Sequence, residues 1–316
     1  MSSTRLIKRR IRSSKNIAQI TKAMEMVSAS KMKRAQQMTL ASRPYSEKMA
    51  DIISQLSTKA QHHIDHFLLK DPRLNWPEEE EFKVLIILFS TDKSLCGGLN
   101  TNLFRGLETW LKTLKQDLKL PPKTKFSFIT LGKKAKEHIL KSNRFLIAEF
   151  PQFGDRPHFQ DILPISRLVI EGFKKGKLQM TFIAYMEFVS TISQKLAVKQ
   201  LLPIETSQFQ FREDQLESSS PQPEETAPSF TSDYIFEPSP EKIFKQLLPQ
   251  YIELQLYHVL LESLASEHSA RMVTMKNASE NALDIIKQLT LEYNQVRQSK
   301  ITNELLDVIG ARMALE

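Results

Sequence analysis

This chain of 316 amino acids lacks several features, and each absence excludes a class of protein. There is one cysteine, Cys96, so no internal disulfide framework can form, as suits a protein of a reducing compartment. The longest apolar run, Val84 to Phe89, has six residues, whereas a membrane-spanning helix needs about 20. We therefore expect no transmembrane span, and the N-terminus shows no apolar segment typical of a secretory signal.

Glycine and proline are missing from both ends of the chain. Residues 1–43 contain neither, and residues 250–316 contain no proline and a single glycine, Gly310. Because these two residues destabilise helix interiors, their absence predicts two very long helices. At about 1.5 Å per residue the two segments would reach roughly 65 Å and 100 Å, which exceeds a compact domain. We expect them to project together as a shaft.

The N-terminal segment, about residues 4–60, carries a stripe of apolar and small side chains at nearly coiled-coil spacing. Its small side chains favour close approach to a partner helix without a strong leucine zipper. Pro44 is predicted to kink the helix. The stripe consists of Ile7, Ile11, Ala18, Thr21, Met24, Val27, Ala35, Met38 and Met49.

Charge is distributed unevenly along the chain, whose formal net charge is +8. Residues 1–43 hold eleven lysines and arginines against one acid, Glu25, while residues 213–241 hold eight acids and no base. A basic N-terminal helix suggests an anionic partner, which could be nucleic acid, anionic lipid or an acidic protein surface. A solvated helix face is the simpler explanation of the same pattern.

The middle of the chain alternates between strand and helix patterns, which predicts an α/β domain with a mainly parallel sheet. Strands are predicted at 83–90, 126–131, 145–150, 180–188 and 196–202, and helices at 100–114, 133–141 and 162–173. Residues 212–241 are rich in Ser, Pro and Glu, a composition that buries too little surface to order itself.

These patterns predict a shaft of two antiparallel helices, as in a long coiled coil, with a Rossmann-like α/β domain at its base. We divide the chain into an N-terminal shaft helix (1–60), a linker (61–81), the α/β domain (82–211), an acidic Ser/Pro-rich loop (212–239) and a C-terminal shaft helix (240–316).

No catalytic or cofactor-binding constellation is evident. The turn from Thr91 to Asn100 follows the first strand, where α/β proteins often bind ligands, but it matches no phosphate-binding motif. Cys96 is best interpreted as a small buried hydrophobe. His62, His63 and His66 lack a metal-ligand pattern and are adequately explained as exposed polar residues. Two alternatives to an enzyme stay open at this point, a basic nucleic-acid-binding protein and a coiled-coil scaffold.

Three separated segments resemble the gamma subunit of F-type ATP synthases of the bacterial type. They are residues 17–36 (IAQITKAMEMVSASKMKRAQ), residues 90–104 (STDKSLCGGLNTNLF), and a third that runs from 262–273 (ESLASEHSARMV) through 289–294 (LTLEYN) to 297–305 (RQSKITNEL). Their order and spacing fit that family over nearly the whole chain. Lys93-Ser94 departs from the usual Arg-Gly, and Arg312 departs from the small residues usual at the C-terminal tip.

The resemblance implies a mechanical role. In the family, the two terminal helices form an antiparallel coiled coil inside a ring of alpha and beta subunits, and the α/β domain sits below with epsilon on the c-ring. Proton flow turns the c-ring and gamma, which drives the beta subunits through their nucleotide affinities. The resemblance thus implies a non-catalytic rotor subunit without cofactor, on the cytoplasmic face of the bacterial inner membrane, touching the membrane only through the c-ring.

The resemblance also assigns roles to individual residues. Contacts with the beta subunits are implied for Lys22, Met24, Arg271, Arg297, Gln298 and Thr302. A contact with the c-ring is implied for Tyr234, Phe236 and Glu237. The central motif of the α/β domain corresponds to Asp92, Gly97, Gly98 and Asn100.

Overall fold

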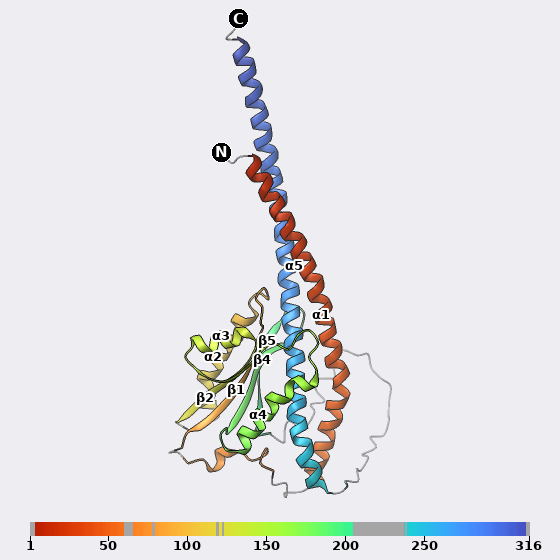
Figure 1. Ribbon diagram of the computed structural model, residues 1–316, viewed down its shortest axis with the longest axis vertical. Helices are drawn as coiled ribbons and strands as arrows, with labels where there is room; N and C mark the ends of the chain where they lie inside the picture. The colour runs from red at the N-terminus through yellow and green to blue at the C-terminus, as the bar shows by residue number, and fades with distance from the viewer. Residues whose placement is uncertain are drawn as a thin grey trace.

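A computed structural model describes residues 4–59, 66–77, 80–117, 120–121, 123–204, 237 and 239–313 (Figure 1). Two long helices, α1 (Thr4–Lys59) and α5 (Pro240–Met313), lie side by side, and the rest of the fold packs beside their lower half. Both chain ends lie toward the top of Figure 1, so the two helices run antiparallel, as predicted. Together, α1 and α5 are the shaft.

The elements between the shaft helices alternate as the sequence predicts. In chain order they are η1 (Pro72–Asn75), β1 (Phe82–Phe89), α2 (Leu99–Asp117), β2 (Thr124–Leu131), α3 (Lys133–Lys141), β3 (Phe145–Phe150), η2 (Phe159–Ile162), α4 (Leu163–Lys174), β4 (Met180–Phe188) and β5 (Gln194–Leu202).

The five strands form one sheet in the order β3-β2-β1-β4-β5. All neighbours pair in parallel except β4 and β5, which pair antiparallel and place Leu202 opposite Thr181. The predicted α/β class with a mainly parallel sheet is therefore confirmed.

The alternation of side chains along β1 builds two cores, one on each face of the sheet. Val84, Ile86 and Leu88 pack with α2 and α3, while Leu85 and Ile87 pack with α4 and the shaft. Burial on both faces explains why β1 is an unbroken apolar run. The shaft-side core continues along α5 from Phe244 to Ala265, so the body and the lower shaft share one core.

Small side chains lie between the shaft helices, as the stripe predicts. Ala18 and Ala35 are buried, and the Ser279 hydroxyl of α5 donates a hydrogen bond of 3.3 Å to the Ala18 carbonyl of α1. One predicted stripe position is wrong, because Val27 is 53% exposed and its neighbour Ser28 is buried instead. The buried residues at 7, 18, 28, 35 and 49 follow the true stripe, and a helix turns by about 100° per residue, which puts Val27 on the outer face.

Pro44, which is predicted to kink the shaft, lies within the continuous helix α1, and Pro249 lies within α5 in the same way. Pro240 opens α5, a position where its missing N–H carries no cost. Among the described residues, no helix is long and apolar enough to span a bilayer.

The segment after α1 is more buried than a polar linker. His66 is only 6% exposed, its Nδ1 accepts a hydrogen bond of 3.3 Å from the Leu68 amide, and its ring lies 4.6 Å from that of Phe67. Leu68 is fully buried in the shaft-side core. The interpretation of the histidines as exposed is therefore wrong for His66, whereas His62 and His63 lie outside the described residues.

Candidate functional site

The loop after β1 is closed by side chains of the central motif. The Asn100 side-chain amide donates to the Thr91 hydroxyl at 2.8 Å and lies 3.6 Å from the Cys96 sulfur. Cys96 is buried, as predicted, and this burial raises the pKa of its thiol. The Asn100 hydrogen bonds hold the first turn of α2 against the loop, which gives this residue a structural role.

Asp92 links this loop to the next crossover helix. Its carboxylate accepts a hydrogen bond of 2.9 Å from the Lys133 amide, at the start of α3, where a negative charge also interacts favourably with the helix dipole. The Asp92 amide donates to the side-chain carbonyl of Gln152 at 3.3 Å. Asp92 thus ties together three segments of the body.

The two glycines of the motif differ in what they permit. Gly97 has a φ of +59°, and a Cβ there would lie 2.8 Å from the Thr274 hydroxyl of α5. A Cβ on Gly98 would meet Asn102 at an ordinary 3.6 Å. Gly97 therefore satisfies both a left-handed backbone and a close approach of the loop to the shaft, while the structure imposes no such demand on Gly98.

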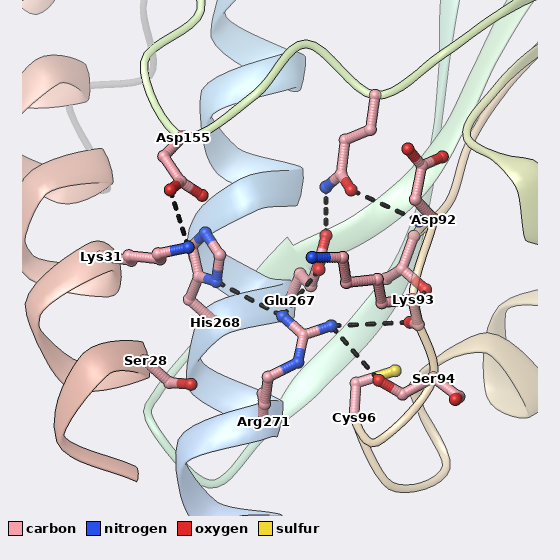
Figure 2. Close-up of polar contacts among 12 residues, drawn as sticks. Ser28, Lys31, Asp92, Lys93, Ser94, Cys96, Asp155, Glu267, His268 and Arg271 are labelled. Carbon is pink, nitrogen blue, oxygen red and sulfur yellow. Dashed lines mark hydrogen bonds and ion pairs between the residues drawn. The ribbon is translucent and has the colours of Figure 1, made fainter. Parts of the chain in front are cut away.

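The loop approaches α5 at a buried arginine, as Figure 2 shows. Arg271 is 9% exposed, and its guanidinium forms an ion pair of 2.7 Å with Glu267, one turn earlier in α5. Its other terminal nitrogen donates to the carbonyl oxygens of Lys93 and Ser94 at 3.5 and 3.4 Å. The arginine thus joins the shaft to the exposed backbone of the motif loop.

Gln152 completes the connection from the other side. Its side-chain amide donates to the second carboxylate oxygen of Glu267, which is 4% exposed. Because the Gln152 carbonyl also receives the Asp92 amide, one side chain bridges the loop and the shaft. The buried carboxylate of Glu267 is thereby both ion-paired and hydrogen-bonded, as a buried charge requires.

The other shaft helix reaches the body through Lys31 of α1, which forms an ion pair of 2.7 Å with Asp155. The hydrogen bond from Lys31 lowers the pKa of the Asp155 carboxyl. His268 lies beside this pair (Figure 2), and its burial, together with the nearby Arg271 and Lys31, lowers its pKa to about 4. His268 is therefore neutral at pH 7, and its Nδ1 accepts from Arg271 at 3.5 Å.

We call this set the junction: Lys31, Gln152, Asp155, Glu267, His268 and Arg271, with the Lys93 and Ser94 carbonyls. It joins both shaft helices to the body through polar contacts. Within the described ranges, no three His, Cys, Asp or Glu residues gather as a metal site would need. The arrangement is suited to holding α1, α5 and the body in a fixed relative orientation.

The predicted contact residues lie at two levels of the shaft. Lys22 is exposed and forms an ion pair of 3.0 Å with Glu25, and Met24 is half-buried. Arg297, Gln298 and Thr302 are exposed, and the Thr302 hydroxyl donates back to the Gln298 carbonyl at 3.0 Å.

The structure does not bring these two groups together. Ser279 lies opposite Ala18, close to the level of Lys22, and Arg297 lies 18 residues further along α5, about 27 Å at 1.5 Å per residue. This distance places Arg297 near the N-terminal end of α1, where α5 continues alone (Figure 1).

The resemblance implies a c-ring contact for three residues. Glu237 is exposed. Tyr234 and Phe236 lie outside the described residues.

Comparisons with known proteins agree over the full length of the chain. A family model described as ATP synthase matches residues 3–315. The ATP synthase gamma chain of Dehalococcoides mccartyi strain 195 is 41% identical over 316 residues and covers both chains completely. The chain belongs to the ATP synthase gamma chain family. The gamma chain of Roseiflexus sp. strain RS-1 is 39% identical, with 100% of this chain and 99% of the relative covered.

Solved structures share the fold of this gamma-family chain. A chain from the rotor of Euglena gracilis mitochondrial ATP synthase aligns with a TM-score of 0.59 at 20% identity, covering 94% of this chain and 98% of its own length. A chain from the central stalk and c-ring of Tetrahymena thermophila mitochondrial ATP synthase aligns with a TM-score of 0.54 at 22% identity, covering 82% and 99%. These likenesses support the shaft-and-body architecture.

Most of the junction of this gamma-family chain could not be found from sequence. Gln152 and Asp155 lie in an irregular segment before η2 and match no motif. The one usable signal was the pair Glu267 and Arg271, whose spacing of four residues is that of an ion pair on one helix face. The resemblance implies a beta-subunit contact for Arg271, and within the single chain its side chain is buried against the body.

Proposed function

We propose that this chain is the gamma subunit, the central-stalk rotor, of a proton-translocating F-type ATP synthase. The observation that carries the proposal is the full-length match to gamma chains. The upper end of the shaft supports it, because apolar side chains there are left exposed within the single chain. Residues 297–312 of α5 are all exposed, although they include five large apolar side chains: Ile301, Leu305, Leu306, Val308 and Ile309. A helix that exposes so many apolar groups requires cover from other subunits.

The partners in this proposal are the alpha and beta subunits around the shaft, and epsilon with the c-ring at its base. Similar solved chains come from assemblies named rotor, and central stalk with c-ring, which supports this arrangement. Catalysis belongs to the beta subunits, and this chain needs no cofactor. The complex would lie on the cytoplasmic face of the bacterial inner membrane, with the c-ring as the chain's contact to the bilayer.

A rotor works only if its contacts differ between rotor angles, because equal affinity for all states of a beta subunit shifts no equilibrium. Antiparallel pairing of α1 and α5 gives the shaft stiffness, and its faces differ around the axis. Lysines and arginines of α1 are exposed along its first fifteen residues, where acidic beta loops could meet them at particular angles.

Two levels of the shaft are assigned to the beta subunits. We place Lys22 and Met24 near a beta hinge loop, and Arg297, Gln298 and Thr302 near a beta catch loop, higher on α5. The c-ring contact is assigned to Tyr234, Phe236 and Glu237. Arg271 acts differently in our proposal: because its guanidinium is engaged inside the junction, it would influence the beta subunits by holding the body to the shaft.

The experiment is reconstitution with purified alpha and beta subunits, followed by measurement of ATP hydrolysis. We expect a complex whose turnover depends on this chain. Failure to associate with alpha and beta, with no effect on their activity, would refute the rotor assignment. Salt-sensitive binding to nucleic acid through residues 5–34 would then support the nucleic-acid alternative.

Met24→Lys tests the lower contact level in the complete proton-translocating complex. The added charge should reduce protons pumped per ATP hydrolysed more than it reduces assembly. Met24→Leu, which conserves size and charge, is the matched control and should pump normally. Equal pumping by the lysine variant would contradict the assigned contact.

A further inference from the structure

A groove of about 750 Å³ lies at the edge of the body, where the first residues of β1, β2 and β3 meet the C-terminal turn of α4. Its floor is apolar and partly open to solvent: Phe145 is 70% exposed and Ile147 is 38% exposed. Both belong to β3, the edge strand of the sheet. The groove therefore offers an extended peptide both apolar side chains and the open side of a strand.

The rim of the groove is basic, with four lysines against two glutamates. Glu81 forms an ion pair with Lys125, and Glu171 with Lys175. Lys83 and Lys177 are exposed and form no ion pair within the described part of the chain. The groove thus combines an apolar floor with unneutralised positive charge, which suits an acidic peptide that also carries apolar side chains.

We propose that residues 205–230 of this same chain bind in the groove. This segment, which lies outside the described residues, carries six carboxylates and one base, Arg212. It also holds Phe209, Phe211, Leu216 and Phe230, which could fill an apolar floor. Its composition therefore complements the groove in both charge and hydrophobicity.

Described residues on both sides tether the segment to the body and to the shaft. Ile204 lies two residues after the end of β5, whose Leu202 pairs with Thr181, three residues beyond the groove residue Leu178. On the other side, Phe244 in the first turns of α5 shares a core with Leu178. A stretch of 26 residues could extend about 85 Å, so length does not limit access to the groove. The tether also supplies a high effective concentration, so modest intrinsic affinity is enough.

Hydrogen exchange on the isolated full-length chain tests the proposal. Glu205, Glu213, Asp214, Glu217, Glu224 and Glu225 are changed to their amides, and exchange is followed at the β3 amides. We expect exchange at least fivefold faster in the neutralised variant, because the peptide leaves the edge strand. Raising salt from 50 to 500 mM should accelerate the wild type toward the same rate, since the pairing is electrostatic.

Variants of the groove lysines test whether the change in exchange depends on the groove itself. Lys83→Glu with Lys177→Glu should reproduce the acceleration, while Lys112→Glu with Lys141→Glu, exposed lysines of α2 and α3 outside the groove, should leave exchange unchanged. Thermal unfolding of each variant distinguishes loss of docking from loss of folding. If a groove variant unfolds, a labelled 205–230 peptide is titrated onto a deletion variant lacking that segment, where saturable binding is expected.

Equal exchange in the wild-type and neutralised chains would overturn the proposal. So would protection that arises only when purified alpha, beta or epsilon subunits are added, because the occupant would then be a partner. Neither outcome bears on reconstituted ATP hydrolysis, so failure here leaves the rotor assignment standing.

Discussion

The two halves of α5 are one continuous helix with opposite surroundings. From Phe244 to Ala282 the helix contributes most of its apolar residues to a core shared with α1 and the sheet, and it buries Glu267, His268 and Arg271 as well. From Leu283 onward no described residue is buried, and Leu305 and Leu306 are 58% and 60% exposed. The apolar side chains of the lower half are buried within the chain, whereas those of the upper half would be covered only by other subunits.

The comparison teaches that apolar content does not by itself mark a core. Both halves have leucines and isoleucines at helical spacing, yet only one half has a body beside it (Figure 1). Burial of polar groups separates the halves better, because a buried charge demands a specific partner. The following changes should therefore act strongly on the lower half and weakly on the upper.

The largest effect is expected at the junction. Arg271→Ala leaves the buried carboxylate of Glu267 without its ion-pair partner, which should lower the free energy of unfolding by about 3–5 kcal/mol. Arg297→Ala, on the exposed upper half, should change it by less than about 0.5 kcal/mol. Chemical denaturation of both variants makes the test, and a similar small change for both would remove the distinction between the halves.

Lowering the pH should destabilise the fold around the lower half of α5, because His268 becomes protonated. Its pKa in the folded chain is lowered from 6.5 to about 4, so between these values the unfolded state binds more protons, and stability falls as pH drops. The full loss is about 3 kcal/mol, reached near pH 4. His268→Gln, which cannot charge, should flatten the dependence of unfolding free energy on pH between 6.5 and 4. An unchanged slope in that variant would show that His268 is not the titrating group.

A smaller loss of stability is expected from a change in the loop after β1, where Gly97 approaches α5. Gly97→Ala places a Cβ in a left-handed conformation and against the Thr274 hydroxyl, which is itself held by the Ala270 carbonyl at 2.7 Å. We expect a loss of about 1–2 kcal/mol in unfolding free energy. Gly98→Ala is the matched control, because its Cβ meets only ordinary contacts. Equal losses at both positions would contradict the special requirement for glycine that the structure places on Gly97 alone.

The smallest effect on stability is expected at the tip. Leu306→Ala should change the unfolding free energy of the isolated chain by less than about 0.5 kcal/mol, since the side chain is already exposed. Leu264→Ala, in the lower core, should cost about 2–5 kcal/mol. In reconstitution with alpha and beta the tip variant should nevertheless reduce turnover, and unaffected turnover would argue against cover by those subunits.

The elements of the fold were largely predictable because their signals are local. The solid apolar run of β1 and the alternation of strands and helices predicted the α/β class, and the lack of glycine and proline predicted the shaft. His66 was misjudged because it was grouped with His62 and His63 as exposed polar residues, although the apolar Phe67, Leu68 and Leu69 follow it directly. Val27 was misassigned because a valine in a stripe of small residues looks like a core position, although the helical turn places Ser28 there.

The sequence by itself determined the two long helices, the class of the body and, through three ordered motifs, the family. Tertiary structure decided which charges are buried, because Lys31 and Asp155, or Arg271 and the Lys93 carbonyl, are far apart in the chain and meet only when the body packs on the shaft. Periodicity reports the face of a helix on which a residue lies. What that face contacts depends on segments that are distant in the chain. These contacts decided that the lower half of α5 is buried against α1 and the body while its upper half is exposed.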